Sequence, residues 1–144
     1  MSLFSLLSVS ASGMSAQRAR AELLVENLAN AETTRTPEGG PYRRKDAVFA
    51  TDAAESPFSS IFEAQLGRPD GVRVAEVVVD NSEPERRYLP GHPDAGKDGY
   101  VAFPRVSPAE DMVDLMGASR GYQANVAAMQ AVKDMINRSV DLLK

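Results

Sequence analysis

The feature that most constrains this chain is a repeat of large side chains every seven residues through its last segment, residues 107–144. The main row is Leu115, Tyr122, Met129, Ile136 and Leu143, and the partner row is Met112, Ser119, Val126 and Val140. This spacing predicts one long helix with an apolar seam of the coiled-coil type. Such a helix would be about 55 Å long, and a chain of 144 residues has no core long enough to cover it.

The start of this helix carries two local signals. Ser107 and Glu110 have the spacing of a capping box, in which each side chain satisfies a backbone N–H at the helix start. Pro108 would occupy the first helical position, where a missing N–H is tolerated. The sequence therefore predicts a helix start at 107–108.

The first segment, residues 1–34, has a weaker form of the same repeat. Its two rows are Leu7, Met14, Ala21 and Leu28, and Leu3, Ser10, Gln17, Leu24 and Ala31. Because Ser10 and Gln17 are polar and Gly13 is unfavourable inside a helix, an ordinary amphipathic helix on a globular core is the alternative. We favour a second seam helix that packs against the C-terminal helix and against other subunits. The predicted packing residues are Leu3, Leu7, Met14, Leu24, Leu28, Met112, Leu115, Tyr122, Val126, Met129, Ile136 and Leu143.

Residues 35–106 differ from both ends, because eight of the nine prolines lie there. The best strand signal is 72–79, a second is 100–103, and a possible third is 47–49. Proline and glycine predict surface loops over 80–99, and residues 56–67 fit either a short helical turn or a loop.

The predicted fold class is therefore α+β. Long N- and C-terminal helices, in segments 1–34 and 107–144, pair as a coiled-coil-like bundle, and a small loop-rich β domain at 35–106 lies between them. Pairing covers only one stripe of each helix, and a central segment of about 70 residues without disulfides is thinly stabilised. We therefore expect neighbouring copies or other proteins to cover the remaining faces, and head-to-tail repetition of such contacts gives a filament or tube.

Composition excludes most enzymatic chemistry. The chain has no cysteine, one histidine and a net charge of −4. The absence of cysteine excludes disulfides, thiolate catalysis and cysteine-bound zinc. The single histidine nearly excludes catalytic or metal sites that need several histidines. The acidic balance argues against nucleic acid as the main partner. We expect no enzymatic activity, no cofactor and no metal.

The sequence also predicts neither a membrane span nor a cleaved signal. No stretch approaches the roughly 20 apolar residues that a span needs. Residues 1–9 are apolar but lack the lysine or arginine that precedes the apolar part of a secretion signal. We therefore expect any export of this chain to use another route.

One motif imitates a phosphate-binding loop. Residues 91–97 fit G-x-x-x-x-G-K, yet Asp98 replaces the Ser or Thr that would hold magnesium and Pro93 removes an amide N–H. We favour a turn-rich loop, and the alternative is a nucleotide-dependent enzyme that uses Lys97. The single histidine, His92, is more readily a loop-bracing side chain than part of a weak metal site.

Two polar features each allow two interpretations. The basic run Tyr-Arg-Arg-Lys at 42–45 suits an acidic partner or phosphate groups, but the acidic residues that follow it make a solvated face the default. Asn27 and Asn30 lie near the end of the first helix. Their amides either bind backbone or a neighbouring chain, or they simply end the helix.

Several blocks of the sequence, in order, resemble the bacterial flagellar rod and hook axial family. The blocks are residues 10–14, 16–18, 27–31, 33–36, 38–45, 90–95, 99–101, 110–115 and 118–126. Asn-Leu-Ala-Asn-Ala at 27–31 marks the wider family, and Arg-Thr-Pro-Glu-Gly-Gly-Pro-Tyr-Arg-Arg-Lys at 35–45 is similar to its proximal-rod members. Ser107-Pro108 and Gly96-Lys97 depart from the family pattern. The matching motif residues are Asn27, Asn30, Thr34, Arg35, Gly39, Gly40, Tyr42, Arg43, Arg44, Ser119, Arg120 and Asn125.

The resemblance implies a structural subunit of the proximal rod, the shaft that carries torque across the periplasm. Terminal helices would form an inner tube and the middle segment an outer domain. Export would go through the flagellar type III apparatus. The implied partners are other copies of the chain, other proximal-rod proteins, the hook–basal-body adaptor at the export gate and the distal rod, with no nucleic acid and no direct membrane span. The alternative is a soluble coiled-coil adaptor that stays in the cytoplasm.

Overall fold

The structure of the chain, a computed structural model, describes residues 3–51 and 71–142. The elements are, in chain order, α1 (Leu3–Ala29), β1 (Lys45–Thr51), β2 (Val72–Val79), β3 (Glu85–Tyr88), β4 (Tyr100–Phe103) and α3 (Pro108–Asp141). Two long terminal helices with short antiparallel strands between them confirm the α+β fold class. The expectation of a helical turn or loop at 56–67 lies outside the described residues, as does Leu143.

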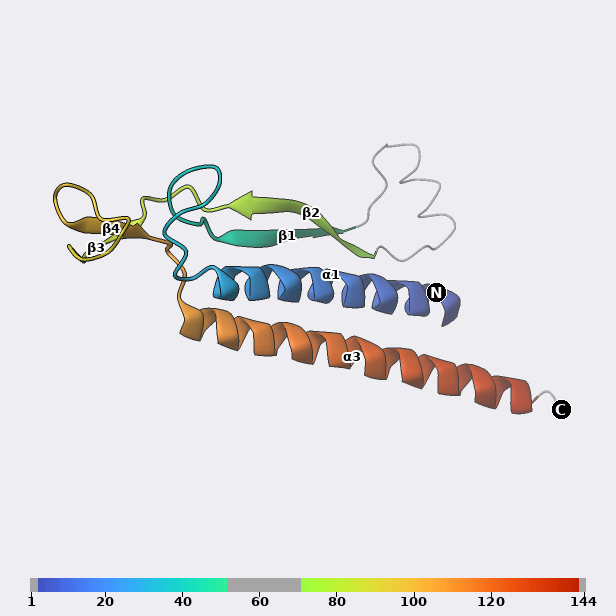
Figure 1. Cartoon of the computed structure of the whole chain (residues 1–144). Helices are drawn as coiled ribbons and strands as arrows, with labels where there is room; N and C mark the ends of the chain where they lie inside the picture. Colours follow the sequence, from blue (N-terminus) through green and yellow to red (C-terminus); the bar gives the residue numbers. More distant parts are fainter. Residues whose placement is uncertain (1–2, 52–70, 143–144) are drawn as a thin grey trace, which may run out of the picture.

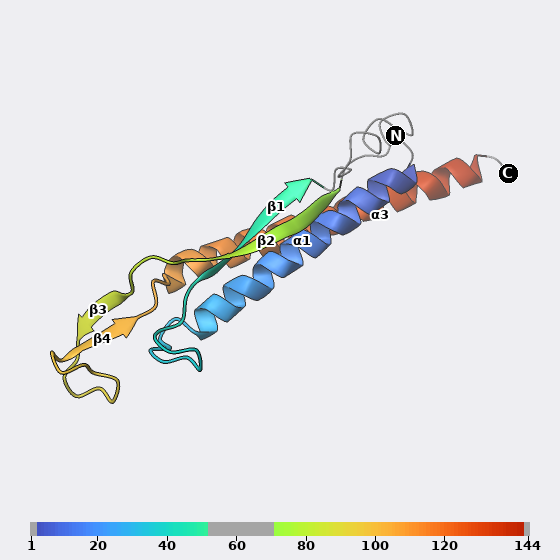
Figure 2. The ribbon, with the colours of Figure 1, turned by 90° about the horizontal axis from the view of Figure 1, so that it is seen from above.

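The molecule is an elongated stack in which α1 lies in the middle (Figure 1). α1 and α3 run antiparallel, so both chain ends lie at the same end of the molecule. The β1–β2 hairpin runs along α1 on the side away from α3, and the β3–β4 hairpin extends beyond the opposite end. Both Figure 1 and Figure 2 show α3 running past the first turn of α1. The C-terminal end of α3 therefore has no partner helix among the described residues.

The helix α3 begins at Pro108, but the predicted capping box is wrong. The side chain of Ser107 makes no capping hydrogen bond. Instead, Pro108 fixes a φ angle suited to the first turn, and the N–H of Asp111 donates to the carbonyl of Ser107 at 3.0 Å. The proline and the backbone start this helix without the hydroxyl.

Small side chains bring the two helices close together. Ala16 and Ala118 are buried at 4% and 1% exposure. A Cβ placed on Gly13 would lie 2.9 Å from Oδ1 of Asn125, and one placed on Gly121 would lie 3.1 Å from Cδ of Gln17. Glycine at these positions, although unfavourable for a helix alone, lets the opposite side chain rest against the helix backbone.

Most of the predicted partner row of α3 is exposed. Met112 is 57% exposed, Ser119 and Val140 are also exposed, and Val126 is half-buried. The buried row lies one position earlier in the heptad and comprises Asp111, Ala118 and Val132, with Asn125 against Gly13. The reason is steric: helices that approach this closely select small side chains for the seam, whereas the sequence pattern favoured the row with the larger ones.

The strands form two separate two-stranded antiparallel sheets. β1 pairs with β2, with Lys45 opposite Val79 and Thr51 opposite Val72, and the register shifts between Val48 and Phe49. The predicted strands 72–79 and 100–103 have the bounds of β2 and β4, and the possible strand at 47–49 lies inside β1.

The strand β3 was missed, because the sequence predicted only loops over 80–99. Its residues, Glu-Arg-Arg-Tyr, are all exposed and show no apolar alternation. Pairing with β4 is what creates it, since Val101 and Phe103 of β4 are buried and β3 supplies the neighbouring backbone. A strand that depends on its partner in this way carries little signal of its own.

Glycine substitutions in the two helices test the close approach. Gly117→Ala meets nothing within 4 Å, so we expect it to stabilise the chain by about 0.5–1 kcal/mol through helix propensity. Gly13→Ala has the same propensity gain but pushes against Asn125, so it should be clearly less stable than Gly117→Ala. Urea unfolding of the two variants measures the difference, and an equal gain for both would contradict the described helix contact.

Candidate assembly interface and the polar junction that positions it

A buried asparagine ties the end of α1 to the start of β1. Asn27 is fully buried. Its Nδ2 donates to the carbonyl of Lys45 at 2.9 Å, and its Oδ1 accepts from the N–H of Lys45 at 3.0 Å. The amide therefore pairs with both backbone groups of one residue, as a neighbouring strand would. We call Asn27, Tyr42, Arg44, Lys45 and Asp111 the polar junction.

Tyr42 completes the bonding of Asn27. Its hydroxyl donates to Oδ1 of Asn27 at 2.9 Å, and the tyrosine is buried. Burial, together with the nearby carboxylates of Glu26, Asp111 and Asp46, raises the pKa of Tyr42 to about 12. The hydroxyl consequently keeps its proton and its role as a donor over the physiological range.

An ion pair links the same junction to α3. Arg44 Nη2 lies 2.9 Å from Oδ1 of Asp111, whose side chain is fully buried, and 3.4 Å from Oδ1 of Asp46. Within the described residues neither carboxylate oxygen of Asp111 accepts a hydrogen bond. Burial raises the pKa of Asp111, Arg44 opposes the rise, and the acidic neighbours Asp46, Asp114 and Glu110 add to it.

Two further ion pairs surround the junction at its exposed edge. Lys45 Nζ lies 2.6 Å from Oε1 of Glu26, and Arg20 Nη2 lies 3.2 Å from Oδ1 of Asp114. All four side chains are more than a third exposed, so each pair contributes little stability in water. They connect α1 to β1 and to the first turns of α3 at the surface.

The loops next to the junction brace each other. Asn30 Nδ2 donates to the carbonyl of Glu26 at 3.0 Å, and its Oδ1 accepts from the hydroxyl of Thr33 at 3.1 Å, so this asparagine shapes the turn after α1. The hydroxyl of Thr34 donates to Oδ2 of Asp94 at 2.8 Å. This bond fixes the loop between β3 and β4 against the turn that follows α1.

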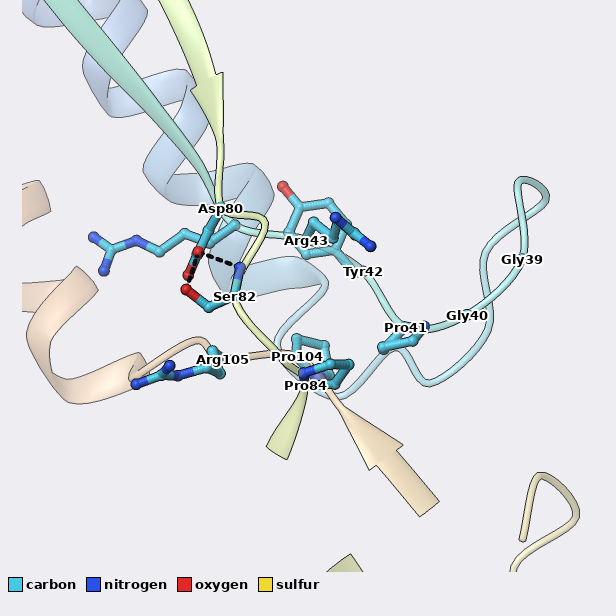
Figure 3. A pocket seen from close by; sticks show the side chains of 11 residues that line it. Gly39, Gly40, Pro41, Tyr42, Arg43, Asp80, Ser82, Pro84, Pro104 and Arg105 are labelled. Carbon is cyan, nitrogen blue, oxygen red and sulfur yellow. Dashed lines mark hydrogen bonds between the residues drawn. The ribbon is translucent and has the colours of Figure 1, made fainter. Parts of the chain in front are cut away.

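The basic run at 42–45 pairs within the chain. Arg43 donates to Oδ1 of Asn81, Arg44 contacts Asp111, and Lys45 contacts Glu26. A cavity of about 70 Å³ lies beside the run, lined by Gly39, Gly40, Pro41, Tyr42, Arg43, Arg44, Asp80, Ser82, Pro84, Pro104 and Arg105. Figure 3 shows Asp80 hydrogen-bonded to Ser82 at this cavity. The cavity is too small for more than a few solvent molecules.

The loop that imitates a phosphate site has the wrong structure for one. It connects β3 to β4 in an antiparallel hairpin, whereas a phosphate-binding loop leads into a helix. His92 Nδ1 accepts from the N–H of Asp94 at 3.1 Å, and the ring packs against Phe103. The nucleotide-binding alternative is therefore wrong, and His92 braces the loop. In the part of the chain that the structure describes, no three His, Asp or Glu side chains cluster closely enough to hold a metal ion.

Apolar side chains remain uncovered along α3. Only Asp111, Ala118 and Val132 of this helix are buried. Exposed apolar side chains follow it along its length, namely Met112, Val113, Met116, Tyr122, Met135, Val140 and Leu142. Surfaces of this kind mark sites of protein–protein contact. We call this set the α3 outer surface.

The structure distributes the predicted packing residues over three environments. Leu24 is buried, whereas Met112 and Tyr122 are exposed. Eight are half-buried: Leu3, Leu7, Met14, Leu28, Leu115, Val126, Met129 and Ile136. Only part of the set thus packs inside one chain, and the role of the rest in contacts between subunits stays a prediction.

The motif residues separate into a junction group and a surface group. Asn27 and Tyr42 are buried. Half-buried are Asn30, Thr34, Arg44 and Asn125, and exposed are Arg35, Gly39, Gly40, Arg43, Ser119 and Arg120. Sequence reasoning missed Asp111 as a site residue, although it stands seven residues before Ala118. An aspartate in a row of small residues was the signal that could have identified it.

Comparison with known proteins gives a consistent result. The family model described as "Flagellar basal body rod FlgEFG protein C-terminal" matches residues 97–142. The flagellar basal-body rod protein FlgC of Borreliella burgdorferi is 38% identical, over 100% of this chain and 99% of the relative. FlgC of Bacillus subtilis is 41% identical over the whole of both chains, and that of Salmonella typhimurium is 36% identical over 99% and 98%.

Alanine at the two asparagines separates their roles. Asn27→Ala leaves the Tyr42 hydroxyl and both backbone groups of Lys45 without partners in a buried place, so we expect a loss of about 3 kcal/mol in the free energy of unfolding. Asn30→Ala removes bonds of a half-buried turn and should cost less than about 1 kcal/mol. Urea unfolding compares them, and equal losses would contradict the junction.

The raised pKa of Asp111 predicts a dependence of stability on pH. The folded state holds the proton of Asp111 more tightly than the unfolded chain, so this contribution is fully present below the unfolded pKa of about 4 and is lost as pH rises through the folded pKa. Relative to Asp111→Asn, the unaltered chain should therefore gain stability as pH falls from neutral towards 4. Urea unfolding at several pH values measures this, and a constant difference would contradict it.

Proposed function

Because this chain belongs to the family of flagellar basal-body rod proteins FlgC, we propose that its terminal helices polymerise into the proximal part of the rod. Members of the family are structural subunits of the rod and not enzymes, and they assemble with other rod components in the basal body. The finer proposal concerns where the chain sits, what it contacts and how it reaches its place.

The observation that supports polymerisation is the α3 outer surface. Met112, Val113 and Met116 are 57%, 63% and 53% exposed near the start of the helix. A lone amphipathic helix is marginal in water, because packing of its apolar face supplies most of its stability. α3 has 34 residues, about 51 Å of helix, and α1 covers a single stripe of it. Neighbouring subunits are the natural cover for the rest.

The arrangement of elements suits a shaft. In the proposed rod the α1–α3 pair forms the inner tube, and the segment 35–106 with its two hairpins forms the outer part. Torque would pass through lateral contacts of the packing residues that are not buried in one chain, Tyr122 among them. The contacts proposed are with other copies of the chain, other proximal-rod proteins, the distal rod and the hook–basal-body adaptor at the export gate.

The proposed route to the rod is export of the unfolded chain by the flagellar type III apparatus. Two properties support it. The chain has no cysteine, so no disulfide has to form or break on the way. Among the residues that the structure describes, the buried apolar ones are few and spread along the molecule, and we expect the free chain to unfold easily. Neither described helix is long and apolar enough to cross a membrane.

Acidic substitutions on the α3 outer surface test the proposal. Met112→Glu with Met116→Glu places two charges where side chains are exposed in the single chain, so we expect the chain to fold and be produced. Motility should be lost, because the charges would be buried against a neighbouring subunit. Swimming in soft agar, with immunoblots of purified basal bodies, measures the effect.

The matched control keeps the same positions apolar. Met112→Leu with Met116→Leu preserves the buried area and should swim normally. If the glutamate variant is incorporated into basal bodies and swims like the control, this part of α3 does not form a subunit contact and the proposal is wrong there.

A further inference from the structure

The middle of the seam between α1 and α3 consists mainly of small side chains. On α1 they are Gly13 and Ala16, and on α3 they are Ala118 and Gly121, with Asn125 against Gly13. A slide of α3 by one turn, about 5.4 Å, would place Gly121 or Met129 opposite Gly13, so in one direction a smaller residue simply replaces Asn125. A buried polar group in a helix seam opposes such a slide.

One buried charge in the seam has a single suitable partner. Asp111 is fully buried in the first turn of α3, and Arg44 Nη2 lies 2.9 Å from its Oδ1. Within the described residues no hydrogen bond reaches either carboxylate oxygen. A one-turn slide would separate the pair and leave a buried carboxylate with no compensation, which is strongly unfavourable.

The partner of this charge is itself fixed to α1. Arg44 precedes Lys45, whose N–H and carbonyl both bind the amide of Asn27 on α1. The position of Arg44 along α1 is thus set by main-chain hydrogen bonds. By contrast, the Arg20–Asp114 pair between the helices is 39% and 43% exposed, so solvent can replace it when the helices move.

We infer that Asp111 is a positioning residue that sets the axial register of α3 against α1 through Arg44, and so determines where along the molecule the exposed side chains of α3 lie. A buried ion pair of this kind contributes specificity more than stability. The register is a property of the single chain and does not depend on the proposed function. Its consequence for assembly does, because a slipped α3 would present its outer surface to a neighbour about 5.4 Å out of place.

Disulfide trapping in the purified chain tests the inference. The chain contains no cysteine, so two introduced thiols report one distance. Gly13→Cys with Asn125→Cys reports the described register, because a Cβ on Gly13 would lie 3.1 Å from Cγ of Asn125. Gly13→Cys with Gly121→Cys, or with Met129→Cys, reports a slide of one turn in either direction.

We expect removal of Asp111 to change which cysteine pair forms the main disulfide. With Asp111 present, 13–125 should dominate in dilute, oxidised protein. With Asp111→Leu, which keeps the seam apolar, the yield of the slipped pairs should rise about tenfold relative to 13–125. The matched control is Asp114→Leu, which removes the exposed neighbouring acid and should leave the cross-linking pattern unchanged.

Two results would overturn the inference. One is an Asp111→Leu chain that stays helical by circular dichroism and still cross-links only at 13–125. The other is measured on a variant in which the two charges are exchanged, Arg44→Asp with Asp111→Arg. This variant keeps the inference testable if Asp111→Leu unfolds. A register role predicts that this exchange restores 13–125 as the main product, and equal yields at all three pairs would contradict it. Because cross-linking is measured on the free chain, its result does not depend on whether the rod proposal is correct.

Discussion

The close approach of two long helices through small side chains is the constraint on which the rest of this structure depends. Glycine and alanine at the seam let α1 and α3 lie side by side, but they bury little apolar surface between them. Several of the larger side chains of α3, Met112 and Met116 among them, are consequently left exposed. The close approach of α1 and α3 therefore explains both the small apolar core and the exposed apolar side chains of α3.

Polar contacts supply the positioning that a larger core would otherwise give. The buried apolar residues are spread along the described part of the molecule, from Ala16 and Leu24 on α1 to Val101 on β4. Asn27 joins the end of α1 to β1 by two hydrogen bonds to Lys45 and accepts a third from Tyr42, and the Arg44–Asp111 pair joins the same point to α3. A rod subunit held this way has defined geometry with modest stability, which suits a chain that is proposed to fold where it assembles.

Much of the fold could be predicted from the sequence, because long periodic elements carry strong signals. The two helices, strands 72–79 and 100–103 and the α+β class follow from periodicity, proline placement and β-branched runs. The sequence could not show which row of α3 packs against α1. Adjacent heptad rows both fit a helix interface, and the outcome depends on which side chains α1 can accommodate. β3 could not be predicted because it depends on pairing with β4. The different roles of Asn27 and Asn30 could not be predicted because the amide of Asn27 binds the backbone of Lys45, which is distant in the sequence.

On the proposed function, α3 needs neighbouring subunits to stay a helix along its whole length. Every described residue of α3 after Ile136 is exposed, and this end runs past α1 (Figure 2). Hydrogen–deuterium exchange tests the claim most directly, on the dilute purified chain and on intact basal bodies. We expect amides after 132 to exchange rapidly in the free chain and slowly in the basal body. Slow exchange of these amides in a dilute monomer would contradict the account.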